Sequence, residues 1–226
     1  MMIPIFIGYD KREAVAFHVC SNSIIRKSTN PVSITPLSLN MFSFYNETHF
    51  DGSNNFIYSR FLVPYLKSYN GWAIFMDGDM LLRSDISELW ALRDEKFAVQ
   101  VVKHEYKTRQ SIKYLGAVNK NYPRKNWSSV ILWNCGHHKN KIISPEKIQN
   151  STGAELHRFT WLNDEEIGEL PIEWNWLPDE FGVNNEAKLL HYTLGTPCFH
   201  EFATTSMGEE WHREKIYTDY CEQYKI

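Results

Sequence analysis

The chain has 226 residues, of which 43% are hydrophobic and 23% charged, so its composition is that of a globular protein and not of a disordered chain. Its length suits one domain with a substantial core, and its formal net charge of -3 argues against nucleic acid as the main partner. Its apolar stretches are too short for a membrane span or a signal sequence, so we expect a cytoplasmic protein with no transmembrane segment.

The first half of the chain alternates between strand-like and helix-like patterns. Residues 3–7 form a short apolar run that predicts a buried strand, and residues 11–27 predict a helix. Residues 32–37 predict a second strand. Residues 55–69 predict a second helix, which Pro64 kinks or restarts. Residues 72–76 then predict a strand that is apolar throughout.

The second half continues this alternation. It predicts a short helix at residues 86–92, strands at 97–102 and 130–133, a helix at 145–159, a strand at 189–192, and a helix at 207–224 within a C-terminal tail of about 207–226. Strands that alternate with helices indicate an α/β fold with a mainly parallel central sheet, here in one domain over residues 1–226.

Residues 73–80 read Ala-Ile-Phe-Met-Asp-Gly-Asp-Met, an apolar strand that ends in Asp77 and Asp79. Two carboxylates at one edge of a sheet can share a divalent cation, which in turn can neutralise a leaving diphosphate. Asp-Gly is equally typical of a turn that ends a strand, so this octapeptide alone leaves both readings open.

A second polar segment, Gly8-Tyr9-Asp10, follows the first predicted strand. Ligands of parallel α/β sheets bind beyond the carboxyl ends of the strands, so one crevice can hold this segment together with Asp77 and Asp79. Asp10 also suits the N-cap of the helix that follows, and the two roles are compatible.

Several segments together resemble the GT-A glycosyltransferases of the glycogenin and lipopolysaccharide galactosyltransferase type, often called family 8. In chain order they are Ile5-Phe-Ile-Gly-Tyr-Asp-Lys-Arg-Glu, Tyr58-Ser-Arg-Phe-Leu-Val-Pro-Tyr-Leu, Phe75-Met-Asp-Gly-Asp-Met and Leu190-His-Tyr-Thr-Leu-Gly-Thr-Pro. Small bacterial and viral glycosyltransferases also share segments similar to Tyr122-Pro-Arg-Lys-Asn-Trp-Ser-Ser and Leu156-His-Arg-Phe-Thr-Trp-Leu-Asn-Asp-Glu-Glu-Ile-Gly. The resemblance covers roughly residues 3–212 and implies a GT-A (Rossmann-like) fold.

The resemblance implies a metal site and a donor site. Asp77, Asp79 and His191 take the positions of the family's ligands for Mn²⁺ (or Mg²⁺), and carboxylates with one imidazole suit Mn²⁺. A histidine that ends an apolar strand is otherwise more often structural. The positions that match donor-binding residues of the family are Gly8, Tyr9, Asp10, Arg60, Asp77, Gly78, Ser128, Ser129 and Gly195.

Two of these expectations have a structural alternative or a departure from the family. Asp164 and Glu165 match an Asp-Gln pair that contacts the reacting sugars, which makes them the candidate catalytic residues. They also suit the acidic first turn of a helix. The late motif of the family ends in Gly-Gly-Pro-Trp or Lys-Pro-Trp, whereas this chain has Thr196, Pro197 and Cys198, which changes the expected diphosphate contact.

The implied function is transfer of a sugar, with retention, from a nucleotide-diphospho sugar, by family default a UDP-sugar, to a carbohydrate or glycoconjugate acceptor. A non-catalytic nucleotide-sugar or carbohydrate-binding domain of the same fold is one alternative. A haloacid-dehalogenase-type phosphatase is another, because those enzymes also end a strand in Asp-x-Asp. They usually carry it near the N-terminus and follow it with Thr or Val, where this chain has Leu81.

Overall fold

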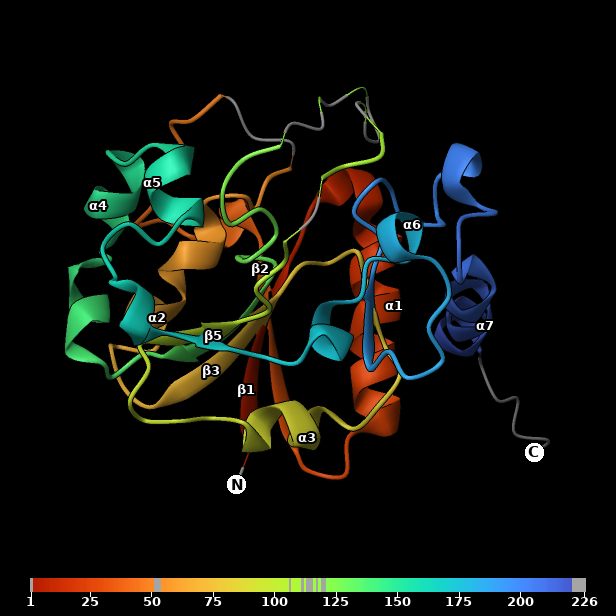
Figure 1. Ribbon diagram of the computed structural model, residues 1–226, viewed down its shortest axis with the longest axis horizontal. Helices are drawn as coiled ribbons and strands as arrows, with labels where there is room; N and C mark the ends of the chain where they lie inside the picture. The colour runs from red at the N-terminus through yellow and green to blue at the C-terminus, as the bar shows by residue number, and fades with distance from the viewer. Residues whose placement is uncertain are drawn as a thin grey trace.

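The computed structural model of the chain describes residues 2–50, 54–105, 107–110, 112, 116, 118 and 121–220. A central sheet has helices on both sides (Figure 1). Its strand order is β2-β1-β3-β6-β5-β7. The strands are β1 Ile3–Gly8, β2 Val32–Leu37, β3 Trp72–Met76, β5 Val99–Val101, β6 Val130–Asn134 and β7 Ile167–Glu169.

Five of these strands run in one direction, and β6 runs antiparallel to both of its neighbours, β3 and β5. The prediction of an α/β fold with a mainly parallel sheet is therefore confirmed. The carboxyl ends of five strands share one edge, and the start of β6 joins them there. Polar residues that follow these strands are brought together at that edge.

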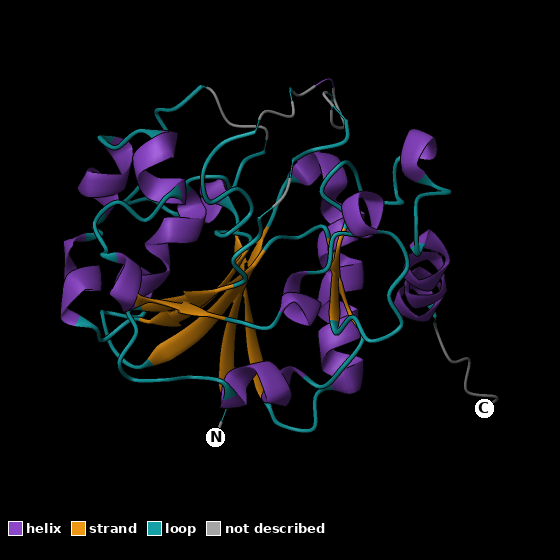
Figure 2. Cartoon of the chain, in the orientation of Figure 1, coloured by secondary structure: helices purple, strands orange, loops and turns teal. Residues whose placement is uncertain are grey.

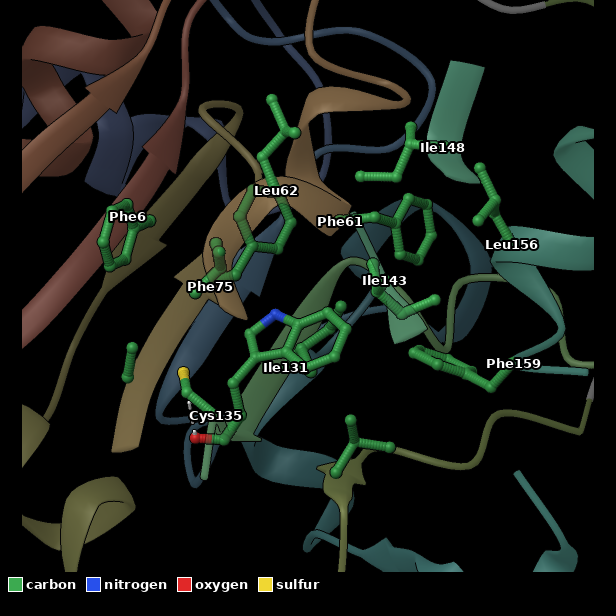
Figure 3. Packing of buried hydrophobic residues seen from close by; sticks show 14 of the residues in the cluster. Phe6, Phe61, Leu62, Phe75, Ile131, Cys135, Ile143, Ile148, Leu156 and Phe159 are labelled. Carbon is green, nitrogen blue, oxygen red and sulfur yellow. Dashed lines mark hydrogen bonds between the residues drawn. The ribbon is translucent and has the colours of Figure 1, made fainter. Parts of the chain in front are cut away.

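Both faces of the central sheet are buried, which explains why β3 is apolar throughout. Ala73 and Phe75 point into one hydrophobic cluster, and Trp72, Ile74 and Met76 point into another on the opposite face. The first cluster, seen in Figure 3, joins the sheet to side chains such as Phe61, Ile148, Leu156 and Phe159 from the segments that cover it. The core thus holds the ends of β1 and β3 in fixed positions.

The helices are shorter than the sequence patterns predict. They are α1 Ala14–Lys27, α2 Val63–Leu66, α3 Ile86–Ala91, α4 Pro145–Gln149, α5 Gly153–His157, α6 Pro178–Phe181 and α7 Gly208–Asp219. The predicted helix at 11–27 begins as a 3-10 turn at Lys11–Glu13. Residues 221–224 of the predicted C-terminal helix lie outside the described residues.

Two of the predicted helices are wrong in extent. The helix expected at 55–69 reduces to a 3-10 turn, Ser59–Leu62, and α2, which starts with Pro64 in its first turn and ends before the left-handed Ser68 and Tyr69. The helix expected at 145–159 is two helices, because Thr152 and Glu155 form a capping box that starts α5 anew.

A small second sheet lies apart from the central one and beside α1 (Figure 2). It pairs β4, Met80–Leu82, with β8, Leu189–His191, in antiparallel register. The predicted late strand at 189–192 is confirmed, but it pairs with β4 and not with the central sheet. None of the described helices has the length and apolar character needed to cross a membrane.

Candidate metal centre

The chain brings Asp77, Asp79 and His191 together through the pairing of two distant strands. Asp77 and Asp79 occupy the short turn between β3 and β4, and the Asp77 amide donates a hydrogen bond to the Ser129 carbonyl (3.0 Å). In the β4–β8 pair, Met80 lies directly opposite His191, so the histidine is placed beside Asp79. The arrangement therefore follows from strand register and not from sequence proximity.

The three side chains form a compact, buried group. His191 Nε2 lies 3.3 Å from Asp79 Oδ1 and 3.7 Å from Asp77 Oδ2. One possible ligand atom from each residue lies within 4.8 Å of the other two, and no residue of the group is more than 7% exposed. Among the described residues, this is the one cluster of three or more His, Cys, Asp or Glu side chains placed to hold a metal.

The hydrogen bonds around His191 orient its ring as a metal ligand. Asn175, which is fully buried, donates through its amide nitrogen to the Asn126 carbonyl (3.3 Å), so its Oδ1 is left to accept from His191 Nδ1 (2.9 Å). With the proton on Nδ1, the lone pair of Nε2 faces the two aspartates. Asp79 Oδ1 is buried and has no hydrogen-bond donor among the described residues. A cation between these atoms would satisfy both, so the donor set fits a divalent metal.

Arg60 is the buried cation of the site. It comes from the 3-10 turn before α2, is 4% exposed, and places NH1 2.9 Å from Asp77 Oδ1 and 2.9 Å from the Ser128 carbonyl. Its guanidinium lies over the rings of Phe75 and Phe56. The sequence alone does not show whether Arg60 is buried, and the structure places it in the interior beside the aspartates.

These groups line one cavity at the carboxyl edge of the central sheet. Its lining residues are Asn54, Ile57, Arg60, Asp77, Asp79, Tyr122, Asn126, Ser128, Ser129, His157, His191 and Thr193. The volume is about 120 Å³, below the roughly 300–1,000 Å³ typical of a pocket for a drug-sized ligand. The cavity can thus admit a metal ion and part of a larger ligand.

The first loop lies next to this cavity without lining it. The Asp10 carboxylate caps the turn after β1 and accepts hydrogen bonds from Arg12 and from the Asn55 amide. Burial alone would raise the pKa of Asp10, but these hydrogen bonds hold it below its ordinary value. The N-cap role is therefore observed. Tyr9 is half-buried against Phe17.

Gly78, in the turn after β3, and Gly195, in the loop after β8, allow close packing. A side chain on Gly78 would collide with the Gly8 carbonyl at 2.4 Å, so the turns after β1 and β3 can touch only without one. A side chain on Gly195 would collide with the Phe202 ring, and Gly195 does not line the cavity.

The acidic candidates lie elsewhere. Asp164 and Glu165 are exposed on the 3-10 turn Asp164–Glu166, and Asp164 pairs with Arg124. Neither belongs to the lining of the cavity.

Several residues of the site carried no role in the sequence prediction. Asn175 lies between Trp174 and Trp176, and a polar residue inside an aromatic stretch was the available signal for a buried hydrogen bond. His157 lies in a segment that carried the family resemblance, but nothing in its spacing linked it to Asp77. Asn54, Asn126 and Thr193 are polar residues in loops, which only the fold assigns to a site.

The fold is shared with several solved structures. WbbM, a bifunctional glycosyltransferase, matches with a TM-score of 0.59 at 17% identity, over 95% of this chain and 49% of that one. GlyE, a glycosyltransferase from Streptococcus pneumoniae TIGR4, matches with a TM-score of 0.65 at 14% identity, over 96% of this chain and 60% of that one. The galactosyltransferase LgtC, solved with donor and acceptor sugar analogues, matches with a TM-score of 0.56 at 11% identity, over 98% of both chains. This chain thus spans about half of WbbM and three fifths of GlyE.

These neighbours define the class of fold, which is that of the GT-A glycosyltransferases. No protein-family model matches the sequence. The chain is 44% identical over 219 residues to Protein CDI of Arabidopsis thaliana. The alignment covers 93% of this chain and 85% of that protein. The chain belongs to the family of that plant protein.

Proposed function

We propose that this protein is a metal-dependent glycosyltransferase of the family 8 type. It transfers a sugar from a nucleotide-diphospho sugar, UDP-linked, to a hydroxyl group of a carbohydrate or glycoconjugate, with retention at the anomeric carbon. The observation that carries the proposal is the buried group Asp77, Asp79 and His191, which shares a cavity with Arg60 at the carboxyl edge of a GT-A sheet. The cytoplasmic location expected from the sequence remains a prediction.

Asp77, Asp79 and His191 would hold Mn²⁺, or Mg²⁺, and the imidazole favours Mn²⁺. When bound, the ion supplies positive charge that neutralises the diphosphate as its bond to the sugar breaks. The charges of the site agree with this role. Two carboxylates outnumber the one guanidinium of Arg60, and a divalent cation would reverse the sign of the site and make it attract a diphosphate.

The chain's own groups bind and orient the donor. Arg60 is fixed through NH1 by Asp77 and Ser128, and its Nε has no hydrogen-bond partner among the described residues, so Nε remains available to a phosphate or sugar oxygen. Ser128 and Ser129 line the same cavity. We assign the nucleoside to the neighbouring loop Gly8-Tyr9-Asp10, because the cavity itself is too small for a whole nucleotide sugar. Gly78 serves by close packing against the Gly8 backbone, and Gly195 leaves room for the Phe202 ring.

Transfer breaks the bond between the anomeric carbon and the diphosphate oxygen, which leaves with the electron pair. A new bond forms between that carbon and the acceptor oxygen, whose proton is released. Retention requires that the acceptor attack the face from which the diphosphate departs. Asp164 and Glu165 remain the proposed carboxylates beside the reacting sugars. An inverting reaction would need one of them as general base.

The direct test is turnover of a UDP-sugar. With Mn²⁺ present, we expect slow hydrolysis of the donor without acceptor and faster transfer with one, and NMR of the product should show the anomeric configuration of the donor. Asp79→Ala should reduce turnover at least a hundredfold, because it removes a metal ligand and lowers metal affinity. Asp94→Ala is the matched control, since Asp94 is an exposed aspartate outside the cavity.

Other outcomes identify the alternatives. Metal-dependent binding of UDP-sugars with no turnover for any acceptor would favour the non-catalytic binding domain. Release of inorganic phosphate from a sugar phosphate, with no use of nucleotide sugars, would favour the phosphatase and contradict the proposal.

A further inference from the structure

His157 is a polar group of the cavity that the metal centre does not use. It is the last residue of α5 and belongs to the cavity lining together with Arg60, Asp77 and Ser128. Its Nδ1 lies 2.7 Å from Ser128 Oγ, whereas its Nε2 is buried and has no hydrogen-bond partner among the described residues. The residue as a whole is half-buried, but its unpartnered Nε2 is shielded from solvent.

The fold holds this ring in place from several directions. The capping box of Thr152 and Glu155 fixes the start of α5. Gly153 lets the Tyr58 hydroxyl approach the first turn, where a side chain would meet it at 2.9 Å. The imidazole and the Phe61 ring pack in a T-shaped arrangement, with ring centroids 5.2 Å apart. A ring fixed this firmly, with one nitrogen left over, is preorganised for a ligand.

The chemistry of that nitrogen favours an uncharged partner. Burial first, and the nearby Arg60 guanidinium second, lower the pKa of His157 well below its ordinary value, so the ring is neutral at physiological pH. A neutral ring adds no charge attraction for phosphate, which Arg60 and the metal supply. A hydroxyl group can both donate and accept, so it pairs with Nε2 whichever tautomer the Ser128 contact selects.

We propose that His157 binds a hydroxyl group of the donor sugar and thereby helps to select which sugar is transferred. This inference rests on the proposed function, because it needs a nucleotide sugar in the cavity. His157 would contact the sugar from inside the cavity, whereas Asp164 and Glu165 lie outside the cavity lining.

Calorimetric titration without acceptor separates the sugar from the nucleotide. The protein, saturated with Mn²⁺, is titrated with UDP and with a panel of UDP-glucose, UDP-galactose, UDP-xylose and UDP-N-acetylglucosamine. For the preferred donor, His157→Ala should weaken binding about three- to tenfold, the effect of one lost hydrogen bond, and should leave the UDP affinity unchanged within about twofold. His138→Ala, at an exposed histidine outside the cavity, should change neither the affinity for the preferred donor nor the affinity for UDP.

Deoxy analogues of the preferred donor then identify the hydroxyl. For the analogue that lacks the contacted group, wild type and His157→Ala should bind equally. The inference would be overturned if His157→Ala lost the same affinity for UDP as for every UDP-sugar, or if it lost affinity for none of them. If the wild-type protein binds neither UDP nor any UDP-sugar, the proposed function fails instead. Thermal unfolding of each variant shows whether it is folded, and His157→Asn serves as a second variant if His157→Ala is not.

Discussion

Asn175 decides which nitrogen of His191 faces the two aspartates. Its amide group is oriented by the Asn126 carbonyl, so its oxygen accepts the Nδ1 proton of His191 and leaves Nε2 bare. A bare Nε2 at 3.3 Å from the Asp79 carboxylate is unfavourable unless a cation lies between them. Asn175 is therefore a positioning residue for the metal, through the histidine that it orients.

We expect Asn175→Ala to raise the dissociation constant for Mn²⁺ by about 10- to 100-fold, since loss of such an orienting partner has this effect in other metal sites. Asn175→Asp keeps an acceptor for His191 and should retain more of the affinity than the alanine variant. The measurement is free Mn²⁺ by electron paramagnetic resonance during titration, with folding checked by circular dichroism. Asn150→Ala, at an exposed asparagine, is the control. Mn²⁺ binding by a folded Asn175→Ala variant equal to that of wild type would show that the hydrogen bond has no such role.

At the scale of elements, the turn between β3 and β4 is shaped by its contact with the end of β1. Gly78 lies against the Gly8 carbonyl, where a methyl group would come within 2.4 Å of backbone that cannot rotate away. The same turn carries Asp77 and Asp79 on either side of that contact. The packing of two strand ends therefore sets the separation of the two carboxylates.

We expect Gly78→Ala to reduce the free energy of unfolding by about 1–3 kcal/mol, the usual cost of overpacking, and also to weaken Mn²⁺ binding. Gly136→Ala is the matched control, because a side chain there would make only ordinary contacts, the nearest at 3.6 Å. Urea unfolding of both variants gives the comparison. If the two substitutions cost the same, close packing of the turn is not what holds the carboxylates.

The sequence predicts the elements that have a strong local pattern. It places β3, the Asp-Gly-Asp turn, α1 and the mainly parallel sheet, because apolar runs and helical spacing are local properties. It does not predict the short strands β4 and β7, which form by pairing with the distant strands β8 and β5. It does not predict where the helices expected at 55–69 and 145–159 are interrupted. Helix caps and left-handed residues involve only two or three positions, which the hydrophobic pattern of a whole segment does not reveal. The positions of Asn175 and His157 depend on tertiary contacts alone.

At the scale of the whole molecule, the cavity lies where separate parts of the fold meet. Its walls come from the end of β3, the start of β6, the end of β8, the turn that carries Arg60 and the end of α5. A ligand that bridges these walls would stabilise the molecule as a whole, because it binds the folded chain and not the unfolded one. A metal that joins β3 to β8 would also tie the small sheet to the central one.

The thermal unfolding of the chain with a UDP-sugar, with and without Mn²⁺, tests the central claim most directly. At a donor concentration about 100 times its dissociation constant, mass action adds about 2.7 kcal/mol, which raises the Tm of a chain of this size by about 5–10 °C. We predict this shift only when Mn²⁺ is present, and predict that Asp79→Ala abolishes it. A shift of equal size in the presence of a chelator, or in the Asp79→Ala variant, would contradict a metal-dependent nucleotide-sugar site at Asp77, Asp79 and His191.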